Sequence, residues 1–149
     1  MMIVGFGSDP NAGQLKAVLM ERARELGHEV RDYGSEDPLY SRAAMEVAHA
    51  VVGGDVDRGV VLCGTGIGVS VSANKVEGAY CALVTDAYQA ERAQLSNAAN
   101  LIALGAQITG SESAKKLLEV YLGSQYRPTD RSTPKLEELQ RLEKSERQS

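Results

Sequence analysis

The amino-acid sequence predicts an α/β protein built on a mostly parallel sheet. Strand-like apolar runs and helix-like segments alternate about five times along the chain, which is typical of this fold class. The run GVVLC at residues 59–63 is almost continuously apolar, as expected of a central strand covered on both faces. The 149 residues, of which 43% are hydrophobic and 24% charged, suit one globular domain with its own core.

Hydrophobic spacing predicts the elements of the first half of the chain. We expect a strand over residues 2–7, a helix over 15–26, a strand over 29–33 and a helix over 41–52. Apolar side chains recur at helical spacing in both helical segments, and glycines at 27 and 53–54 follow them as stop signals. The turn Gly-Ser-Asp-Pro ends the first strand.

The second half continues the alternation. We expect a strand over residues 59–63, a glycine-rich turn over 64–68, a short helix to residue 74, a strand over 79–84, a helix over 86–94, a strand over 101–104 and a helix from 111 to 122. Asp86 stands at or near the N-cap of its helix. The tail differs, because eight of its last fifteen residues are charged. It is either a solvated helix or a helix whose leucine stripe (Leu136, Leu139 and Leu142) docks on a partner subunit.

Charge and composition exclude several classes of protein. The net charge of −4 provides no basic surplus for nucleic acid or an anionic membrane surface. No apolar run approaches the roughly 18–20 residues of a membrane span, and the first residues do not resemble a signal peptide. Two cysteines, Cys63 and Cys81, form neither a disulfide framework nor a four-ligand zinc set. We therefore expect a cytoplasmic protein without metal or cofactor.

In a parallel sheet, ligands bind beyond the carboxyl ends of the strands, where the strand order switches. The loops after the first, third, fourth and fifth strands carry Asp9, residues 63–68, Asp86 and Gln107. We expect the site among these loops.

The densest signal is the segment LCGTGIGVSVSANK at residues 62–75. Glycines at 64, 66 and 68 let the backbone approach an anion, and the helix that follows offers free N–H groups. No Gly-Lys-Ser/Thr follows, and the spacing is not that of a dinucleotide site. Amide groups around Cys63 favour its thiolate, a general base, although a small buried hydrophobic residue is also common at the end of a core strand. Cys81 lies inside a strand and reads as structural.

These residues resemble the ribose-5-phosphate isomerase B and galactose-6-phosphate isomerase family. The resemblance rests on CGTGIG with SANKVEG, on GSD at 7–9, on DPLY at 37–40 and on SNAANLIALGAQITG at 96–110, and it covers roughly residues 2–125. It implies a Rossmann-like three-layer α/β/α sandwich with a five-stranded sheet. It also implies aldose–ketose isomerisation of a sugar phosphate through a cis-enediol, without metal. Family members are homodimers or dimers of dimers with shared active sites.

The resemblance also implies roles for residues around the glycine turn. Cys63 would move the proton between C1 and C2, and Thr65 would shuttle protons on the enediol oxygens. The amides of Gly64, Gly66 and Gly68 would hold the enediolate oxygen.

Further residues would bind the substrate. By the same resemblance, Asp9 and Asn97 would bind sugar hydroxyls and Tyr40 would line the pocket. In the tail, Arg131 and Lys135 keep the four-residue spacing of a family motif, with a one-residue gap. Residues 1–125 would form the isomerase domain, and 126–149 an arm of the same domain at the dimer interface.

The chain departs from the family pattern at three positions. Pro10 follows Asp9 where the family has histidine, Ser96 replaces a histidine assigned to opening the cyclic sugar, and Gln107 replaces an arginine. The only histidines, His28 and His49, lie outside the expected site loops and read as structural.

These departures point to a short substrate. A tetrose 4-phosphate has its C4 oxygen phosphorylated and cannot form a furanose, so its enzyme needs no ring-opening acid. The stretch ERAQLSNAAN at 91–100 also resembles the family subgroup that acts on tetrulose 4-phosphates. We therefore expect a tetrose/tetrulose 4-phosphate isomerase. A ribose-5-phosphate isomerase and a non-catalytic sugar-phosphate-binding protein remain the alternatives.

Overall fold

The computed structural model describes residues 1–148. Strands and helices alternate nearly as expected. The elements are β1 (Ile3–Ser8), the 3-10 helix η1 (Pro10–Ala12), α1 (Gly13–Glu25), β2 (Glu29–Asp32), α2 (Tyr40–Val52), β3 (Arg58–Cys63), α3 (Ile67–Ala73), β4 (Cys81–Leu83), α4 (Ala87–Leu95), β5 (Leu101–Gly105), α5 (Ser111–Leu122) and α6 (Thr133–Gln148). No helix within residues 1–148 is long and apolar enough to span a membrane.

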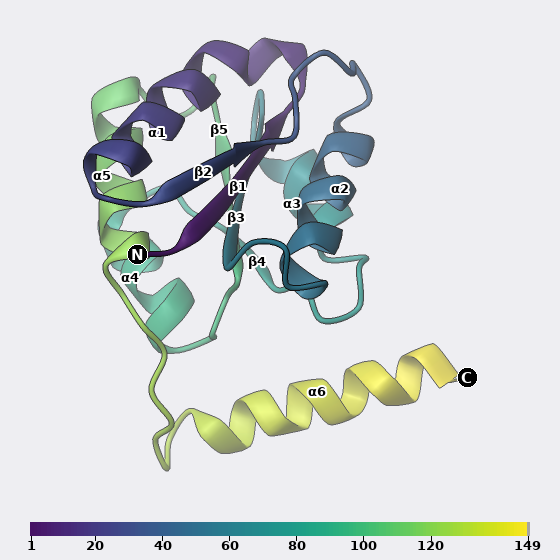
Figure 1. Cartoon of the computed structure of the whole chain (residues 1–149). Helices are drawn as coiled ribbons and strands as arrows, with labels where there is room; N and C mark the ends of the chain where they lie inside the picture. The colour runs from purple at the N-terminus through teal and green to yellow at the C-terminus, as the bar shows by residue number, and fades with distance from the viewer. Residues whose placement is uncertain (149) are drawn as a thin grey trace.

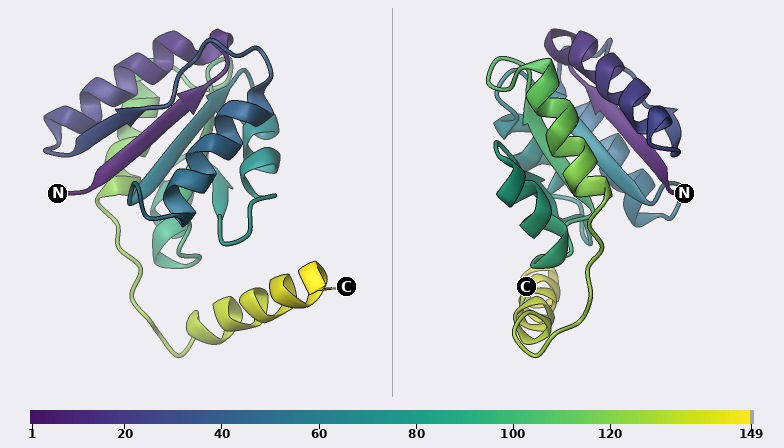
Figure 2. Two further views of the ribbon diagram at one scale, coloured as in Figure 1. Left: turned by 45° about the vertical axis from the view of Figure 1, so that its right-hand side comes forward. Right: turned by 90° about the vertical axis from the view of Figure 1, so that its left-hand side faces the viewer.

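The sheet confirms the predicted fold class. Its strand order is β2-β1-β3-β5-β4, and every neighbouring pair is parallel. One core packs α1, α4 and α5 on one face of the sheet, and a second core packs α2 and α3 on the other. Figures 1 and 2 show these three layers. The chain is thus a Rossmann-like α/β/α sandwich with a fully parallel sheet.

The alternation of side chains along β3 decides which face carries each residue. Val60 and Leu62 belong to the core beneath α1 and α5, whereas Val61 and Cys63 belong to the core beneath α2 and α3. Successive residues of a strand point to opposite faces. The last residue of β3 therefore faces α3, the helix that begins just after the glycine turn.

The strand order switches at β1, whose neighbours are β2 on one side and β3 on the other. At the carboxyl end of this pair, the Asp9 N–H donates to the Leu62 carbonyl at 3.3 Å. The loop after β1 is thereby held beside the glycine turn after β3. This is the crevice in which open parallel sheets bind ligands.

The C-terminal arm lies at the opposite end of the sheet, near the amino ends of the strands. Figures 1 and 2 show α6 (yellow) crossing below the body, on the side where the strands begin. The buried Arg58 guanidinium donates to the carbonyls of Tyr121 and Ser124, both at 2.7 Å, and so fixes the start of the linker. Gln94 accepts from the Tyr126 N–H at 2.7 Å. Arg58 on β3 and Gln94 on α4 thus set the direction in which the C-terminal arm leaves α5.

Residues near the C-terminal end of α6 contact the loop between α3 and β4. The Tyr80 hydroxyl donates to Glu143 at 3.1 Å, and Arg147 lies 3.8 Å from Glu77. The leucine stripe is only partly covered, because Leu136 is 8% exposed whereas Leu139 and Leu142 are each 46% exposed.

Candidate active site

A pocket of about 500 Å³ opens at the carboxyl edge of the sheet, at the predicted place. Six of the residues that sequence analysis selected line it together: Asp9, Tyr40, Cys63, Gly64, Thr65 and Gly68. Two exposed apolar residues of α3, Ile67 and Val71, complete the wall. We call this the cysteine pocket.

Cys63 is 5% exposed, and its sulfur accepts a hydrogen bond from the Gly66 N–H at 3.2 Å. An N–H donor at this position stabilises negative charge on the sulfur. Gly66 has a φ of +82°, and a Cβ there would lie 2.9 Å from the backbone carbon of Leu104. Only glycine therefore suits the turn. The Thr65 hydroxyl oxygen accepts from the Ile67 N–H at 3.2 Å and holds the start of α3.

Asp9 is 6% exposed and caps η1, because its carboxylate accepts from the Ala12 N–H at 3.2 Å and from the Asn11 side chain at 3.3 Å. Pro10 follows as the first residue of that helix, a position that proline favours. The departure from the family pattern at residue 10 therefore has a local structural reason.

The absence of a side chain at Gly68 leaves room for the Tyr40 ring. A Cβ at Gly68 would lie 2.5 Å from the Tyr40 ring, so the ring packs directly on the backbone. Gln107 lies beside the same turn, since its N–H donates to the Gly64 carbonyl at 2.9 Å. Asp86 caps α4 through the Gln89 N–H at 2.8 Å and does not line the cysteine pocket.

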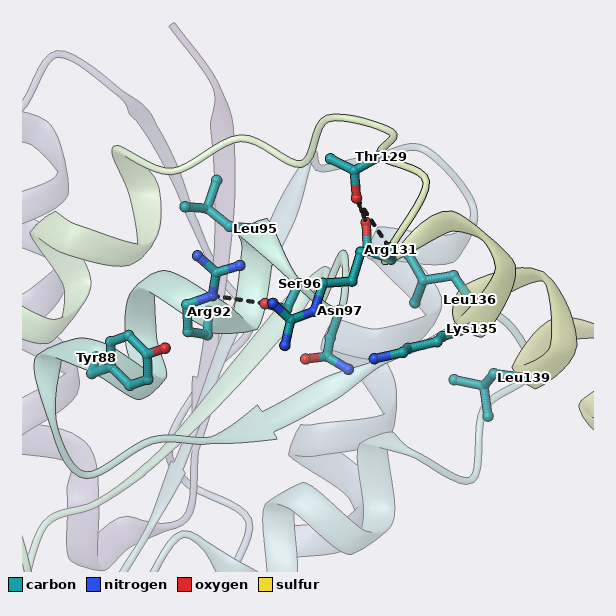
Figure 3. Close-up of a pocket in the computed structure, with 11 residues that line it drawn as sticks. Tyr88, Arg92, Leu95, Ser96, Asn97, Thr129, Arg131, Lys135, Leu136 and Leu139 are labelled. Atoms are coloured by element: carbon teal, nitrogen blue, oxygen red, sulfur yellow. Dashed lines mark hydrogen bonds between the residues drawn. The ribbon is translucent and has the colours of Figure 1, made fainter.

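The remaining candidate residues gather elsewhere. Ser96, Asn97, Arg131 and Lys135 line a second pocket of about 450 Å³, which we call the arm pocket (Figure 3). The helix α4 starts where β4 ends and runs back to where β5 starts. Its last turn therefore lies at the amino edge of the parallel sheet. Since β3 has six residues, about 20 Å of sheet separates the two edges.

The arm pocket is rich in positive charge. Arg92, Arg131 and Lys135 line it, and no carboxylate is among its lining residues. Within residues 1–148, neither Arg131 nor Lys135 has an ion-pair partner. Ala98, in the turn after Asn97, has a φ of +49°. That left-handed conformation is costly for alanine and marks a locally strained turn at the pocket.

Sequence reasoning missed Arg92. Its Nε donates to the Ser96 hydroxyl oxygen at 2.7 Å, and Figure 3 shows both side chains at the arm pocket. Their separation of four residues on a helix was the available signal, because such residues share a face.

The residues interpreted as structural lie outside both pockets. Burial raises the pKa of Cys81 to about 12, so its thiol stays protonated at neutral pH. The His28 ring accepts the Met2 N–H at 3.1 Å, and burial, followed by the positive charges of the N-terminus and Arg58, lowers its pKa. His49 is exposed on α2. In residues 1–148, no cluster of three or more His, Cys, Asp or Glu side chains is arranged to hold a metal.

Known proteins resemble the chain over nearly its whole length. The family model described as Ribose/Galactose Isomerase matches residues 4–139. D-erythrulose-4-phosphate isomerase of Pectobacterium atrosepticum is 38% identical over 99% of this chain and 99% of its own. Ribose-5-phosphate isomerase B of Escherichia coli is 38% identical over 85% of this chain and 87% of its own.

Solved structures agree with the sequence relatives. Ribose-5-phosphate isomerase B of Clostridium thermocellum has a TM-score of 0.91 and 33% identity, covering 97% of this chain and 99% of that one. The type B ribose 5-phosphate isomerase from Trypanosoma cruzi, as a mutant, has a TM-score of 0.93 and 28% identity, covering 98% and 99%. With its glycine turn and cysteine at the carboxyl edge of a parallel sheet, this chain belongs to the ribose/galactose isomerase family of sugar-phosphate isomerases.

Proposed function

We propose that this isomerase interconverts a tetrulose 4-phosphate and the corresponding aldose 4-phosphate. The observation that carries the proposal is Ser96, a side chain held by an arginine, at the position where the family's pentose enzymes have a ring-opening histidine. A tetrose 4-phosphate cannot close into a furanose, so its isomerase needs no acid at that place. The 38% identity to an erythrulose-4-phosphate isomerase over the full chain supports the same substrate.

The cysteine pocket supplies the groups for proton transfer. The Cys63 thiolate removes a proton from C1 of the ketose, and the electron pair forms an enediolate between C1 and C2. The Cys63 thiol then delivers this proton to C2, while Thr65 moves the hydroxyl proton from the C1 oxygen to the C2 oxygen, which leaves an aldehyde at C1 and regenerates the thiolate. The Gly66 N–H is already donated to Cys63. The enediolate oxygen is therefore left to Gly64 and to Gly68, whose N–H lies in the first turn of α3 without a helical acceptor.

Each pocket alone is half of a site. No lysine, arginine or histidine lines the cysteine pocket, so nothing there balances the charge of a phosphate. The arm pocket has three cations but no group suited to take a proton from carbon. Because the two lie at opposite edges of one sheet, they meet only across two copies of the chain. In the homodimer, or dimer of dimers, the arm of one subunit brings Arg131 and Lys135 to the phosphate at the cysteine pocket of the other.

Exposed apolar residues supply a surface for that dimer. Ile67 and Val71 on α3 are 56% and 54% exposed, and Leu139 and Leu142 on α6 are 46% exposed. Ile67 and Val71 flank the cysteine pocket, and Leu139 lines the arm pocket. A second copy would bury both groups.

The function is tested by isomerisation assays on D- and L-erythrulose 4-phosphate, D-erythrose 4-phosphate and D-ribose 5-phosphate, with Cys63→Ala as control. Turnover of a tetrose phosphate that requires Cys63 supports the proposal. Much faster turnover of ribose 5-phosphate supports the second candidate, a ribose-5-phosphate isomerase, which the 38% identity to the Escherichia coli enzyme favours. Sugar-phosphate binding without any turnover would identify a non-catalytic binding protein.

The shared site is tested by mixing Cys63→Ala with Arg131→Ala at a substrate concentration far below the KM of Arg131→Ala, where each variant alone should be nearly inactive. A hybrid dimer has one site with both defects and one site with neither. Random exchange makes half of the dimers hybrids, so the mixture should regain about a quarter of the wild-type activity. A mixture that stays inactive after exchange, with hybrids detected by mass, would contradict a site built from two subunits.

A further inference from the structure

The arm pocket contains a pair of side chains to which the proposed mechanism has so far given no joint role. Arg92, in the last turn of α4, donates from Nε to the hydroxyl oxygen of Ser96 at 2.7 Å. The nearest carboxylate to its guanidinium is Glu91, at 3.8 Å from one terminal nitrogen. That distance exceeds a hydrogen bond. The terminal nitrogens of Arg92 are therefore available to a ligand.

The chemistry of the two groups fixes the direction of the Ser96 hydroxyl. A guanidinium only donates hydrogen bonds, and it keeps its protons throughout the physiological range. Ser96 must therefore accept from Arg92, and its own hydrogen is directed to another acceptor. Within the described part of the chain, the Ser96 hydroxyl has no second partner. The Ser96 hydroxyl is therefore an oriented hydrogen-bond donor that can donate to an oxygen atom of a ligand.

The charges around this donor define the acceptor. Figure 3 shows the Arg131 side chain reaching towards Ser96 and Asn97, with Lys135 on the same side of the pocket. Three cations thus line the same pocket as one hydroxyl donor, and no carboxylate lines the pocket to neutralise them. A tetrahedral oxyanion satisfies such an arrangement, because its oxygens accept several charge-assisted hydrogen bonds at once.

We propose that Arg92 and Ser96 form one unit that binds the phosphate of the substrate. Arg92 pairs with a phosphate oxygen and holds Ser96 in place as a donor to the same group. Arg92 is thus a specificity-determining residue, and Ser96 is not an acid–base catalyst, since the partner that fixes it neither accepts nor releases a proton. The inference rests on the proposed function and deepens it: the substrate must arrive as an open chain, because no group in this unit opens a ring.

The test measures binding of inorganic phosphate to the full chain by titration calorimetry, which needs no turnover. Arg92→Gln should weaken phosphate binding about tenfold, the size expected when a charge-assisted hydrogen bond is lost. Ser96→Ala should weaken it less. The double variant Arg92→Gln/Ser96→Ala should lose less phosphate affinity than the product of the two single fold-changes, because the two side chains act as a unit. Arg24→Gln is the matched control, since it also removes one arginine charge that pairs with a neighbouring glutamate on a helix.

Kinetics separate binding from folding defects. With a tetrulose 4-phosphate, Arg92→Gln should raise KM about tenfold and leave kcat within about threefold. Arg92→Lys should recover only part of the lost affinity. Lysine keeps the positive charge, but it lacks the planar guanidinium that can donate to Ser96 and to the phosphate at the same time. If ribose 5-phosphate is turned over, its rate at high enzyme concentration should level off at the rate of spontaneous ring opening.

The outcomes distinguish this inference from the proposed function. Phosphate binding that Arg92→Gln and Arg24→Gln leave equally strong would overturn the role of Arg92, even if tetrose isomerisation through Cys63 is found. Ring opening of ribose 5-phosphate accelerated by wild type but not by Ser96→Ala would overturn the donor role of Ser96. Arg92-dependent phosphate binding without any isomerisation would instead remove the proposed function and leave the anion site.

Discussion

At the residue scale, the two cysteines of the chain lie in opposite surroundings. Cys63 receives an N–H hydrogen bond in an open pocket, whereas burial raises the pKa of Cys81 to about 12. Cys63→Ala should lower kcat by about three orders of magnitude or more, because it removes the proposed general base. Cys81→Ala should change kcat little. Equal losses in the two variants, measured with circular dichroism as a check on folding, would contradict the assignment of the base.

A second residue-scale prediction concerns Gly68, on which the Tyr40 ring rests. A methyl group at Gly68 would overlap that ring, which lies 2.5 Å from the position of the added Cβ. Gly68→Ala should therefore displace Tyr40 and lower kcat/KM by about tenfold or more, since small misplacements in a site are costly. A Cβ at Gly110 meets no atom within 4 Å, so Gly110→Ala is the matched control. An unaffected Gly68→Ala enzyme would show that Tyr40 does not shape the site.

At the scale of elements, an ion pair between a buried lysine and a half-exposed aspartate joins α1 to the end of β2. The Lys16 ammonium lies 2.6 Å from Asp32, and Lys16 is 3% exposed. Burial alone would raise the pKa of Asp32, but hydrogen bonds from Lys16 and the Gly34 amide, with the charges of Lys16 and Arg24, outweigh burial and hold that pKa below its ordinary value. The folded protein therefore releases this proton more readily than the unfolded chain does.

The sign of this shift gives a prediction of stability against pH. The contribution of Asp32 is complete above its unfolded pKa of about 4 and is lost as the pH falls through the lower, folded value. Asp32→Asn should lower the free energy of unfolding at pH 7 by about 1 kcal/mol, because the carboxylate is half exposed and water screens the pair. Urea titrations at pH 7 and pH 3 should show the difference shrinking at the lower pH. A constant difference would exclude titration of Asp32 as its origin.

Local patterns predicted the elements well, and the exceptions have identifiable causes. The fourth strand is shorter than residues 79–84, because the N–H of Ala79 bonds to Val76 and that of Tyr80 to the side chain of Asn100. These N–H groups take no part in the ladder with β5. At η1 the sequence predicts only a turn, because three residues are too few to show a helical period. The cysteine pocket followed from sequence because its residues end adjacent parallel strands or begin the loops and helices beside them.

The arm pocket was harder to predict, because its position depends on the directions of helices. Ser96 and Asn97 are close in sequence to β5, but the return of α4 places them at the edge opposite Cys63. The contact between Arg92 and Ser96 depends on rotamers that a sequence does not display. The linker before α6 is set by Arg58 and Gln94, which lie far from it along the chain. Such long-range contacts exist only in the folded molecule.

At the scale of the whole molecule, the proposed site shared by two chains would make activity depend on protein concentration. On dilution below the dissociation constant of the dimer, the activity per chain should fall as monomers appear in mass measurements. An excess of Cys63→Ala chains should restore the activity of dilute wild type, because they lend it an unaltered arm. An excess of the double variant Cys63→Ala/Arg131→Ala should not. Full activity of a confirmed monomer would exclude the shared site.

The placement of the two pockets at opposite edges of one sheet also bears on how such an enzyme evolves. If the arm pocket binds the phosphate as proposed, a mutation at the end of α4 or in the linker before α6 would change which anion is held and how far it lies from the reacting carbons. Within one chain, no residue lines both pockets, so the two sets of residues can vary nearly independently. A lineage can therefore exchange one sugar for another through changes at one edge, while the proton-transfer chemistry at the other edge is inherited without alteration.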